Sequence, residues 1–188
     1  MNKRPLYIVQ KGFTLVELLI VAIILAILAA IIVPQFASTT TDAQESALRS
    51  DLAAMRAAID LYRQQHGANP GVNVSDGATC IGGTKGTGTA GTALAFRDQL
   101  VRYTNANGDS CSLQTAGAET FPFGPYLKED QIPANPITNS AVIEIVTAGD
   151  LEMVGTGAAL GWKYDSTNGK FIANDTNTDS VNVAYDTY

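Results

Sequence analysis

The chain has 188 residues, of which 46% are hydrophobic and 16% are charged, and its formal net charge at pH 7 is −6. This length suits one domain and an accessory segment. The acidic balance, with no basic face, argues against a nucleic-acid-binding protein. An enzyme needs histidine, cysteine or carboxylate side chains that converge on one site. The sequence shows no pattern that would bring such residues together with the single histidine, His66. The composition therefore favours a protein that is not an enzyme and has no nucleic acid among its partners.

The N-terminal segment joins a basic stretch to a long apolar one. Residues 1–12 carry three cations and no acid, residues 18–33 contain no polar side chain, and Glu17 stands at the front of the apolar run. A secretory signal peptide also starts with basic residues, but its apolar region is usually about 7–15 residues long. A plain membrane anchor explains the length, because about 20 apolar residues cross a bilayer. It leaves Glu17 unexplained.

A third interpretation assigns a function to Glu17. Cleavage between Gly12 and Phe13 would remove the basic leader and leave a free amino group on Phe13. Glu17 lies four residues further along, about one helical turn away. A carboxylate in a membrane segment is costly unless it is paired. Pairing of Glu17 with the amino terminus of a neighbouring subunit would neutralise both charges and set the register of an assembly.

The stretch KGFTLVELLIVAIILAILAAIIVPQF (11–36) resembles the N-terminus of the type IV pilin superfamily, which includes the pseudopilins of type II secretion. Gly12, Phe13, Glu17 and Pro34 occupy the matching positions. The resemblance implies that an inner-membrane prepilin peptidase cuts after Gly12 and methylates Phe13, and that Glu17 and Pro34 serve assembly. It also implies a homopolymer with other pilin-like subunits, built by an inner-membrane platform with its ATPase.

The same resemblance implies an α+β, type IV pilin-like fold. After the leader (1–12), a long helix would have a transmembrane first half (13–36) and an amphipathic second half (37–66). It would pack on a small antiparallel β-sheet domain with long loops (67–188). The precursor would cross the bacterial inner membrane once, with its positive N-terminus in the cytoplasm. The assembled subunit would stand in a periplasmic or cell-surface filament.

The second half of the helix carries a one-sided apolar seam. Its members follow spacings of 4, 3, 4 and 3: Leu48, Leu52, Met55, Ile59 and Tyr62. We expect the seam to pack on the chain's own domain. Arg49, Arg56 and Arg63 would form a solvated face or contact neighbouring subunits. Upstream, Pro34 predicts a kink or local melting of the helix, and Gly67 predicts its end.

Two cysteines, Cys80 and Cys111, lie in turn-rich sequence beyond the helix. Neither has a CxxC partner, so a zinc site is a poor fit. An even count behind a membrane-targeting segment favours a disulfide in an oxidising compartment. Two free thiols are the alternative. Residues 86–91 match GxGxxG without a preceding strand, which predicts a flexible connection and no dinucleotide site.

The remaining sequence predicts one short helix and three strands. The helix is expected at 93–103, and an alternating strand at 141–147. Residues 160–166 and 169–175, joined through Thr-Asn-Gly, predict a hairpin. This hairpin and the loop GPYLKEDQIPANP (124–136) resemble the corresponding parts of type II secretion pseudopilins.

A loop near the C-terminus places oxygen-bearing side chains at alternate positions, Asp175, Asn177 and Asp179. This spacing suits calcium, and the major pseudopilins that the chain resembles carry calcium in a C-terminal loop. The cluster lacks the closing glutamate of an EF-hand. Polar turn residues without any cofactor are therefore the alternative interpretation.

Together these features predict a structural pilin-like subunit that polymerises into a type II secretion pseudopilus for protein export. One alternative is the pilin of a type IV pilus, a surface filament for adhesion, motility or DNA uptake. A further alternative is a membrane-anchored binding domain. Loss of assembly with retained membrane insertion in a Glu17→Ala variant would separate the filament subunits from an anchored domain.

Overall fold

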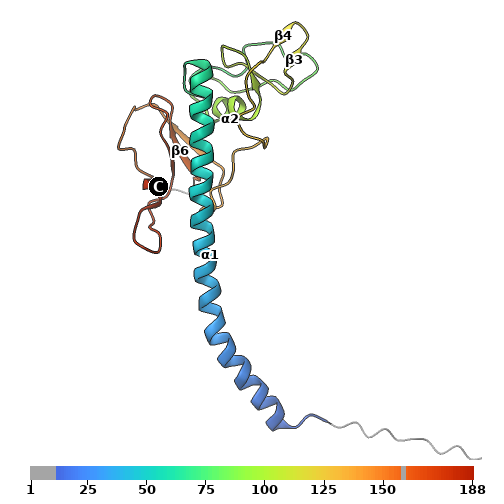
Figure 1. Ribbon diagram of the computed structural model, residues 1–188, viewed down its shortest axis with the longest axis vertical. Helices are drawn as coiled ribbons and strands as arrows, with labels where there is room; N and C mark the ends of the chain where they lie inside the picture. The colour runs from blue at the N-terminus through green and yellow to red at the C-terminus, as the bar shows by residue number, and fades with distance from the viewer. Residues whose placement is uncertain (1–11, 158–159) are drawn as a thin grey trace, which may run out of the picture. The chain divides into compact units, whose positions relative to one another are not determined.

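Helix α1 is the longest element of the computed structural model, which describes residues 12–157 and 160–188 (Figure 1). Its 52 residues, Leu15–His66, begin in one unit of the chain, Met1–Asp42, and end in the other, Ala43–Tyr188. Each of the two units has its own internal contacts.

In the first unit, α1 continues through Pro34 without a break. Of the two predicted effects of Pro34, local melting is therefore wrong, and a kink stays a prediction. A proline already has a helical φ angle, and its missing N–H removes only the hydrogen bond to the carbonyl of Ala30. The helix starts at Leu15, two residues later than the sequence predicts. The reason is that the hydroxyl of Thr14 accepts a hydrogen bond from the N–H of Glu17, as the side chain of an N-cap residue does.

In the second unit, the predicted seam of α1 forms the centre of the hydrophobic core. All five seam residues are at most 1% exposed: Leu48, Leu52, Met55, Ile59 and Tyr62. They form one cluster with five large residues from outside α1: Phe96, Leu100, Trp162, Tyr164 and Phe171. Complete burial of one such side chain stabilises a fold by about 1.5–3 kcal/mol. The seam therefore attaches α1 to the rest of this unit, as the sequence predicts.

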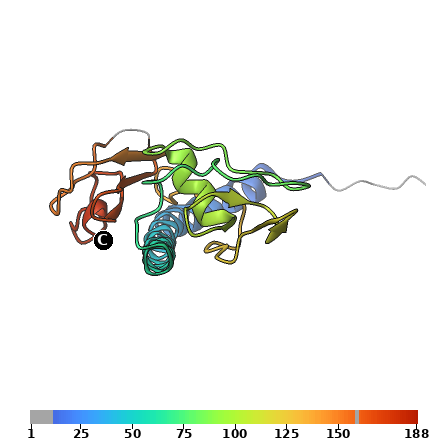
Figure 2. The same ribbon diagram turned by 90° about the horizontal axis from the view of Figure 1, so that it is seen from above.

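Helix α2, Ala93–Val101, covers part of this core (Figure 2). Its N-cap is Thr92, whose side chain accepts a hydrogen bond from the N–H of Ala95 at 3.2 Å. The predicted helix is thus present and ends two residues early. On the outer side of this helix, Leu94 is 47% exposed.

Three small sheets complete the unit. Strands β1 (Tyr103–Thr104) and β2 (Ser110–Cys111) form one antiparallel pair, and β3 (Thr115–Ala116) and β4 (Glu119–Thr120) form another. Seen from above, the β3–β4 pair and the C-terminus lie on opposite sides of the end of α1 (Figure 2).

The third sheet has the order β5-β6-β7, with β5 at Ile143–Val146, β6 at Trp162–Asp165 and β7 at Phe171–Ala173. The hairpin β6–β7 is antiparallel, as predicted, but β5 pairs with β6 in parallel. The sheet is therefore mixed. The connection 147–161 is long enough for the crossover that a parallel pair requires. A short 3₁₀ helix, Tyr185–Thr187, follows the sheet.

The glycine-rich connection 86–91 is anchored to the fold, which corrects the prediction of a flexible loop. The carbonyl of Gly88 accepts a hydrogen bond from the N–H of Ser75 at 2.9 Å, and its own N–H donates to Ser75 Oγ at 2.9 Å. A Cβ atom at Gly88 would lie only 2.0 Å from the N of Ala95. Glycine is required there because the loop backbone touches the start of α2.

Candidate functional site

The predicted cleavage bond, between Gly12 and Phe13, lies in a non-helical stretch at the edge of the described residues. The leader residues 1–11 lie outside them. Phe13 is 74% exposed, and an added Cβ at Gly12 would meet nothing within 4 Å. No contact among the described residues therefore requires glycine at this position. An accessible, non-helical peptide next to a small residue is what a processing peptidase can bind.

Thr14 and Glu17 form a capping box at the start of α1. The N–H of Glu17 donates to Thr14 Oγ1 at 3.2 Å, and the N–H of Thr14 donates to Glu17 Oε2 at 3.4 Å. Each side chain thus satisfies a backbone donor that a helix start leaves free. The sequence analysis missed this arrangement, although the pattern Thr-x-x-Glu before an apolar run is its usual signal.

The capping box gives Glu17 a role within its own chain. A carboxylate near the positive end of a helix is stabilising, and the loss of a cap costs about 0.5–2 kcal/mol. The bond from the Thr14 N–H to Glu17 is long, and it leaves Glu17 Oε1 with further acceptor capacity. Capping is therefore compatible with a second partner for the same carboxylate, such as an amino group.

The apolar start of α1 has the properties of a membrane span. Residues Leu15–Val33 have a mean hydropathy of 3.2, and none of this stretch is buried within the chain. Nineteen helical residues are about 28 Å long, close to the roughly 30 Å of a hydrocarbon core. By length and composition, this is the one stretch of the described chain that is able to cross a membrane.

Two arginines that the sequence assigns to solvent or to neighbouring subunits contact the C-terminal segment of their own chain, and the side chain of Arg49 is also 57% exposed, as a solvated face predicts. Arg49 Nη2 donates to Tyr188 Oη at 2.8 Å and to Asp179 Oδ2 at 3.4 Å, and its guanidinium lies 4.4 Å from the centre of the Tyr188 ring. Arg56 donates to the carbonyl of Phe171 at 3.1 Å and to that of Tyr188. We call Arg49, Arg56, Asp179 and Tyr188 the arginine clamp.

The carboxylate of Asp179 is the acceptor at the centre of this clamp. The Tyr188 hydroxyl donates to it, and the backbone N–H groups of Val181 and Val183 do so at 2.8 Å each. The Tyr188 hydroxyl, these N–H groups and the Arg49 guanidinium hold the pKa of Asp179 below its usual value. The ionised form of Asp179 is therefore part of the folded state.

These contacts do not fit the predicted calcium site. Asp175 Oδ1 accepts hydrogen bonds from the N–H of Asn177 at 2.9 Å and from its side-chain amide at 2.7 Å, and Asp179 is engaged by the arginine clamp. A guanidinium beside Asp179 already supplies the cation there. Among residues 12–157 and 160–188, no group of three or more His, Cys, Asp or Glu is placed to hold a metal. Calcium at this loop stays a prediction that the geometry does not support.

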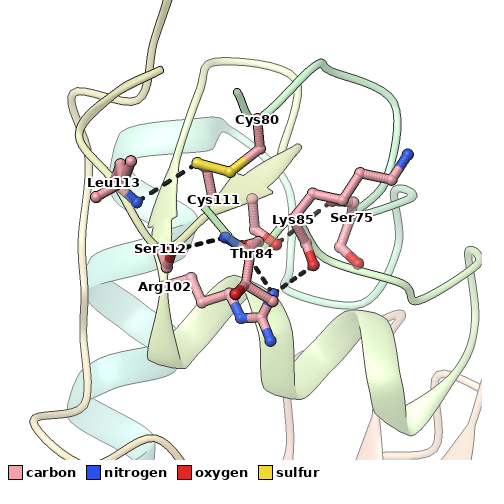
Figure 3. The surroundings of a disulfide bond; sticks show 9 residues. Ser75, Cys80, Thr84, Lys85, Arg102, Cys111, Ser112 and Leu113 are labelled. Carbon is pink, nitrogen blue, oxygen red and sulfur yellow. Dashed lines mark hydrogen bonds between the residues drawn. A yellow bond between two sulfur atoms is a disulfide. The ribbon is translucent and has the colours of Figure 1, made fainter. Parts of the chain in front are cut away.

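Cys80 and Cys111 are joined by a disulfide, as the sequence predicts, with their Cα atoms 5.6 Å apart (Figure 3). Their separation of 31 residues corresponds to a stabilisation of about 3–4 kcal/mol in the chain-entropy model. Arg102 reinforces the same loop, because its Nη1 donates to the carbonyls of Thr84, at 3.1 Å, and of Lys85. The disulfide implies an oxidising compartment for this unit.

The single histidine, His66, ends α1 as a packing residue. Its ring stacks on Tyr62 with the centroids 3.9 Å apart, and its Nε2 lies 3.0 Å from Thr104 Oγ1. Burial lowers the pKa of His66. Its ring also packs against Phe123 with the centroids 5.0 Å apart, so these contacts give His66 a structural role at the end of α1.

Comparisons with known proteins identify the N-terminal segment. Residues 9–33 match the prokaryotic N-terminal methylation motif. The type II secretion system core protein G of Pseudomonas aeruginosa is 43% identical over 61 residues, which are 32% of this chain and 43% of that protein. A fimbrial protein of Neisseria meningitidis serogroup B is 40% identical over 77 residues, which are 41% and 45% of the two chains.

A third relative, the type IV major fimbrial protein FimA of Dichelobacter nodosus, is 49% identical over 51 residues, 27% of this chain and 33% of that protein. The chain thus matches less than half the length of each of these relatives. No solved structure matches it significantly. The methylation motif includes Gly12, Phe13 and Glu17. The N-terminal part of the chain therefore carries the N-terminal methylation motif and is distantly homologous to the corresponding part of type II secretion core protein G and of type IV fimbrial proteins.

Proposed function

We propose that this chain is a structural subunit of a type II secretion pseudopilus. A prepilin peptidase would cut it between Gly12 and Phe13 and methylate the new terminus. The subunit would wait in the inner membrane and then join a filament with further copies and other pilin-like subunits. The observation that carries this proposal is the methylation motif over residues 9–33, which coincides with an apolar helix that has no covering inside the chain.

The apolar helix would serve both states of the subunit. Side chains of Leu15–Val33 need lipid before assembly, and they need the helices of other subunits afterwards. Moving such a helix from lipid into a packed bundle replaces one apolar environment by another. The transfer therefore carries no large hydrophobic penalty, and van der Waals packing and polar pairs decide its direction.

Glu17 would supply the polar pair. Its capping box with Thr14 holds the carboxylate at the start of the helix, near the level of Phe13. After cleavage, the amino group of Phe13 in a neighbouring subunit would meet this carboxylate. One charge pair for each subunit would then fix how far successive helices are staggered, because any other stagger leaves an unpaired charge in an apolar environment.

Two lines of support favour the pseudopilus. The core protein G of two bacteria, Pseudomonas aeruginosa and Klebsiella pneumoniae, is 43% and 36% identical over 61 residues each. The hairpin β6–β7, whose sequence resembles the terminal hairpin of pseudopilins, is present in the fold. A type IV pilin is the second candidate, because the match to the fimbrial protein of Neisseria meningitidis extends over 77 residues.

The first test is N-terminal sequencing and intact mass of the protein from its native membranes. We expect a chain that starts at Phe13, carries one additional methyl group and lacks two hydrogens because Cys80 and Cys111 are oxidised. The matched control is a Gly12→Leu variant, which should keep the leader. A wild-type chain that retains Met1, or that is cut beyond Val33, contradicts the proposal.

Deletion of the gene distinguishes the two filament classes. Loss of proteins from the culture medium, with surface fibres unchanged, is the result expected of a pseudopilin. Loss of surface fibres with normal protein export would instead identify a type IV pilin. Complementation with the wild-type chain is the control for both readouts, and a chain with Glu17→Ala should fail to complement in either case.

A further inference from the structure

One short loop of the second unit is attached to its surroundings mainly through a cysteine. Residues 78–83 lie between Gly77 and Thr84, and no hydrogen bond runs from them to any other part of the described chain. The bond from Cys80 to Cys111 is their covalent attachment to the fold (Figure 3). We call residues 78–83 the cysteine flap.

Both ends of the cysteine flap are held by hydrogen bonds that do not involve the cysteines. Before it, the N–H of Gly77 donates to Asp109 Oδ1 at 2.9 Å. After it, the N–H of Thr84 donates to Ser112 Oγ at 2.8 Å, and the carbonyl of Thr84 accepts from the N–H of Ser112 at 3.0 Å. These bonds give the flap two fixed ends, between which its middle is held by the disulfide.

The cysteine flap covers a small apolar cluster that is separate from the main core. The cluster consists of Cys111, Ala116 and Phe121, each at most 1% exposed. Ala78 and Cys80 of the flap pack against it. Apolar burial stabilises in proportion to the area removed from water, so a cluster of this size holds its cover weakly.

The flap's own side chains add little to this packing. Ile81 contacts the turn between β3 and β4, because a Cβ atom added at Gly117 would lie 2.9 Å from Ile81 Cδ1. Even so, Ile81 is 63% exposed. A loop without hydrogen bonds to its surroundings and with a largely exposed isoleucine depends on its cross-link to stay in place.

A thiol reagent meets the disulfide at Cys80, which is half-buried, whereas Cys111 is fully buried. A thiolate of a dithiol forms a bond to Cys80 Sγ, the bond between the two cysteines breaks, and Cys111 leaves as a thiolate that takes up a proton. The second thiol of the reagent then displaces Cys80 and passes its proton to it. The two cysteines are thereby reduced, and the dithiol is oxidised to a cyclic disulfide.

We propose that the Cys80–Cys111 disulfide is a redox-sensitive switch that opens and closes the cysteine flap. Reduction releases residues 78–83 and uncovers Cys111 and Phe121, while the flap's two ends and the main core stay folded. Such local opening is a property of segments with few contacts of their own. The flap is therefore open in reducing surroundings and closed in oxidising ones. This switch needs only the fold of the second unit and does not depend on the proposed function.

Alkylation of the folded, full-length protein in detergent tests the switch. With dithiothreitol and iodoacetamide present, we expect Cys111 to be alkylated at a rate close to that of Cys80, although Cys111 is fully buried in the closed state. The fluorescence of Trp162, a residue of the main core, should not change. Hydrogen exchange should stay slow at Gly86 and Ser112, whose N–H groups donate to backbone carbonyls at 2.9 and 3.0 Å.

A variant with both Cys80→Ser and Cys111→Ser is the matched control for the reagent. We expect subtilisin to cut it within residues 78–83 faster than it cuts the oxidised wild type, with or without dithiothreitol. Protection of Cys111 after Cys80 has been alkylated overturns the proposal, because the flap then stays closed without its bond. Loss of the Trp162 signal or of slow exchange on reduction of the wild type also overturns it, since the disulfide would then support the whole unit. A folded double variant that resists cleavage as the wild type does has the same consequence.

Discussion

The two units of the chain differ in how far their apolar side chains are exposed. Between Phe13 and Val33 the large apolar side chains are 44–81% exposed. In Ala43–Tyr188 the seam of α1 is at most 1% exposed and packs with aromatic residues of α2 and the sheet. The second unit completes its own core. The first has an apolar surface that the described residues leave exposed.

The polar residues show the same contrast. In the second unit, buried charges find partners within the chain, as Asp98 does with Ser75 Oγ at 3.2 Å and with Arg97 at 2.7 Å. In the first unit, the partner that the described residues provide for Glu17 is Thr14, through the capping box. The second unit therefore satisfies its apolar and buried charged groups within the chain, whereas the first leaves its apolar side chains exposed.

The largest effect should come from removing Glu17. We expect Glu17→Ala to abolish filament formation while membrane insertion and the second unit stay intact, because the variant loses the carboxylate that would pair with a neighbouring amino terminus. It also loses one half of the capping box with Thr14. Sheared or cross-linked filaments measure assembly, and carbonate extraction of membranes measures insertion. Normal filament yield from this variant would contradict an assembly role for Glu17.

Two control variants separate the charge of Glu17 from its cap. Glu17→Gln can still accept the N–H of Thr14 but has no charge, and Thr14→Ala removes the other half of the capping box. We expect Glu17→Gln to fail in assembly as Glu17→Ala does. Thr14→Ala should assemble with a helix start destabilised by about 0.5–2 kcal/mol. The opposite order of effects would mean that the cap alone explains Glu17.

Much of this contrast can be predicted from the sequence, because periodicity reports burial directly. The 4-3-4-3 spacing predicts the buried seam, and the apolar run at 18–33 predicts the exposed helix. The parallel pairing of β5 is not predictable in this way, since alternation marks a strand but not its neighbour. The arginine clamp cannot be predicted from the sequence either, because Arg49 and Asp179 are 130 residues apart and no local pattern connects them.

A cavity in the seam should give the next largest effect. Leu52→Ala should destabilise the second unit by about 2–5 kcal/mol, because Leu52 is 1% exposed and its neighbours cannot fully close the space. Leu61→Ala is the matched control, since Leu61 is 45% exposed on the same helix. Urea titration of the full chain in detergent, followed by the fluorescence of Trp162, the single tryptophan, measures both. Equal midpoints would show that the seam does not support the core.

The arginine clamp should give a smaller effect and also tests the calcium prediction. Arg49→Ala should lower the melting temperature by a few degrees and should make the region around Tyr188 more accessible to proteases, because Asp179 loses its cation. Addition of calcium or a chelator should leave the wild-type melting temperature unchanged. A rise with calcium in the wild type would contradict the clamp as the cation of this loop.

The pH dependence of the clamp has a definite sign. The pKa of Asp179 is lowered on folding, so its contribution is complete above the unfolded value, about 3.9, and is lost as the pH falls toward the native pKa. Arg49→Ala should therefore narrow the difference in stability between neutral and strongly acidic pH. Arg63→Ala is the control, since Arg63 is exposed on the same helix and lies outside the clamp.

The smallest expected effect is a pH dependence of stability that comes from His66. It should be present in the second unit and absent from the first. Burial lowers the pKa of His66, so the folded state favours the neutral ring that stacks on Tyr62. The unfolded chain then binds a proton more readily, and the stability of the second unit should fall modestly as the pH drops below about 6.5. His66→Gln should remove this slope while lowering stability at every pH. Membrane insertion depends on the apolar first unit and should not change over the same range. A slope that persists in His66→Gln would assign the pH dependence to another group.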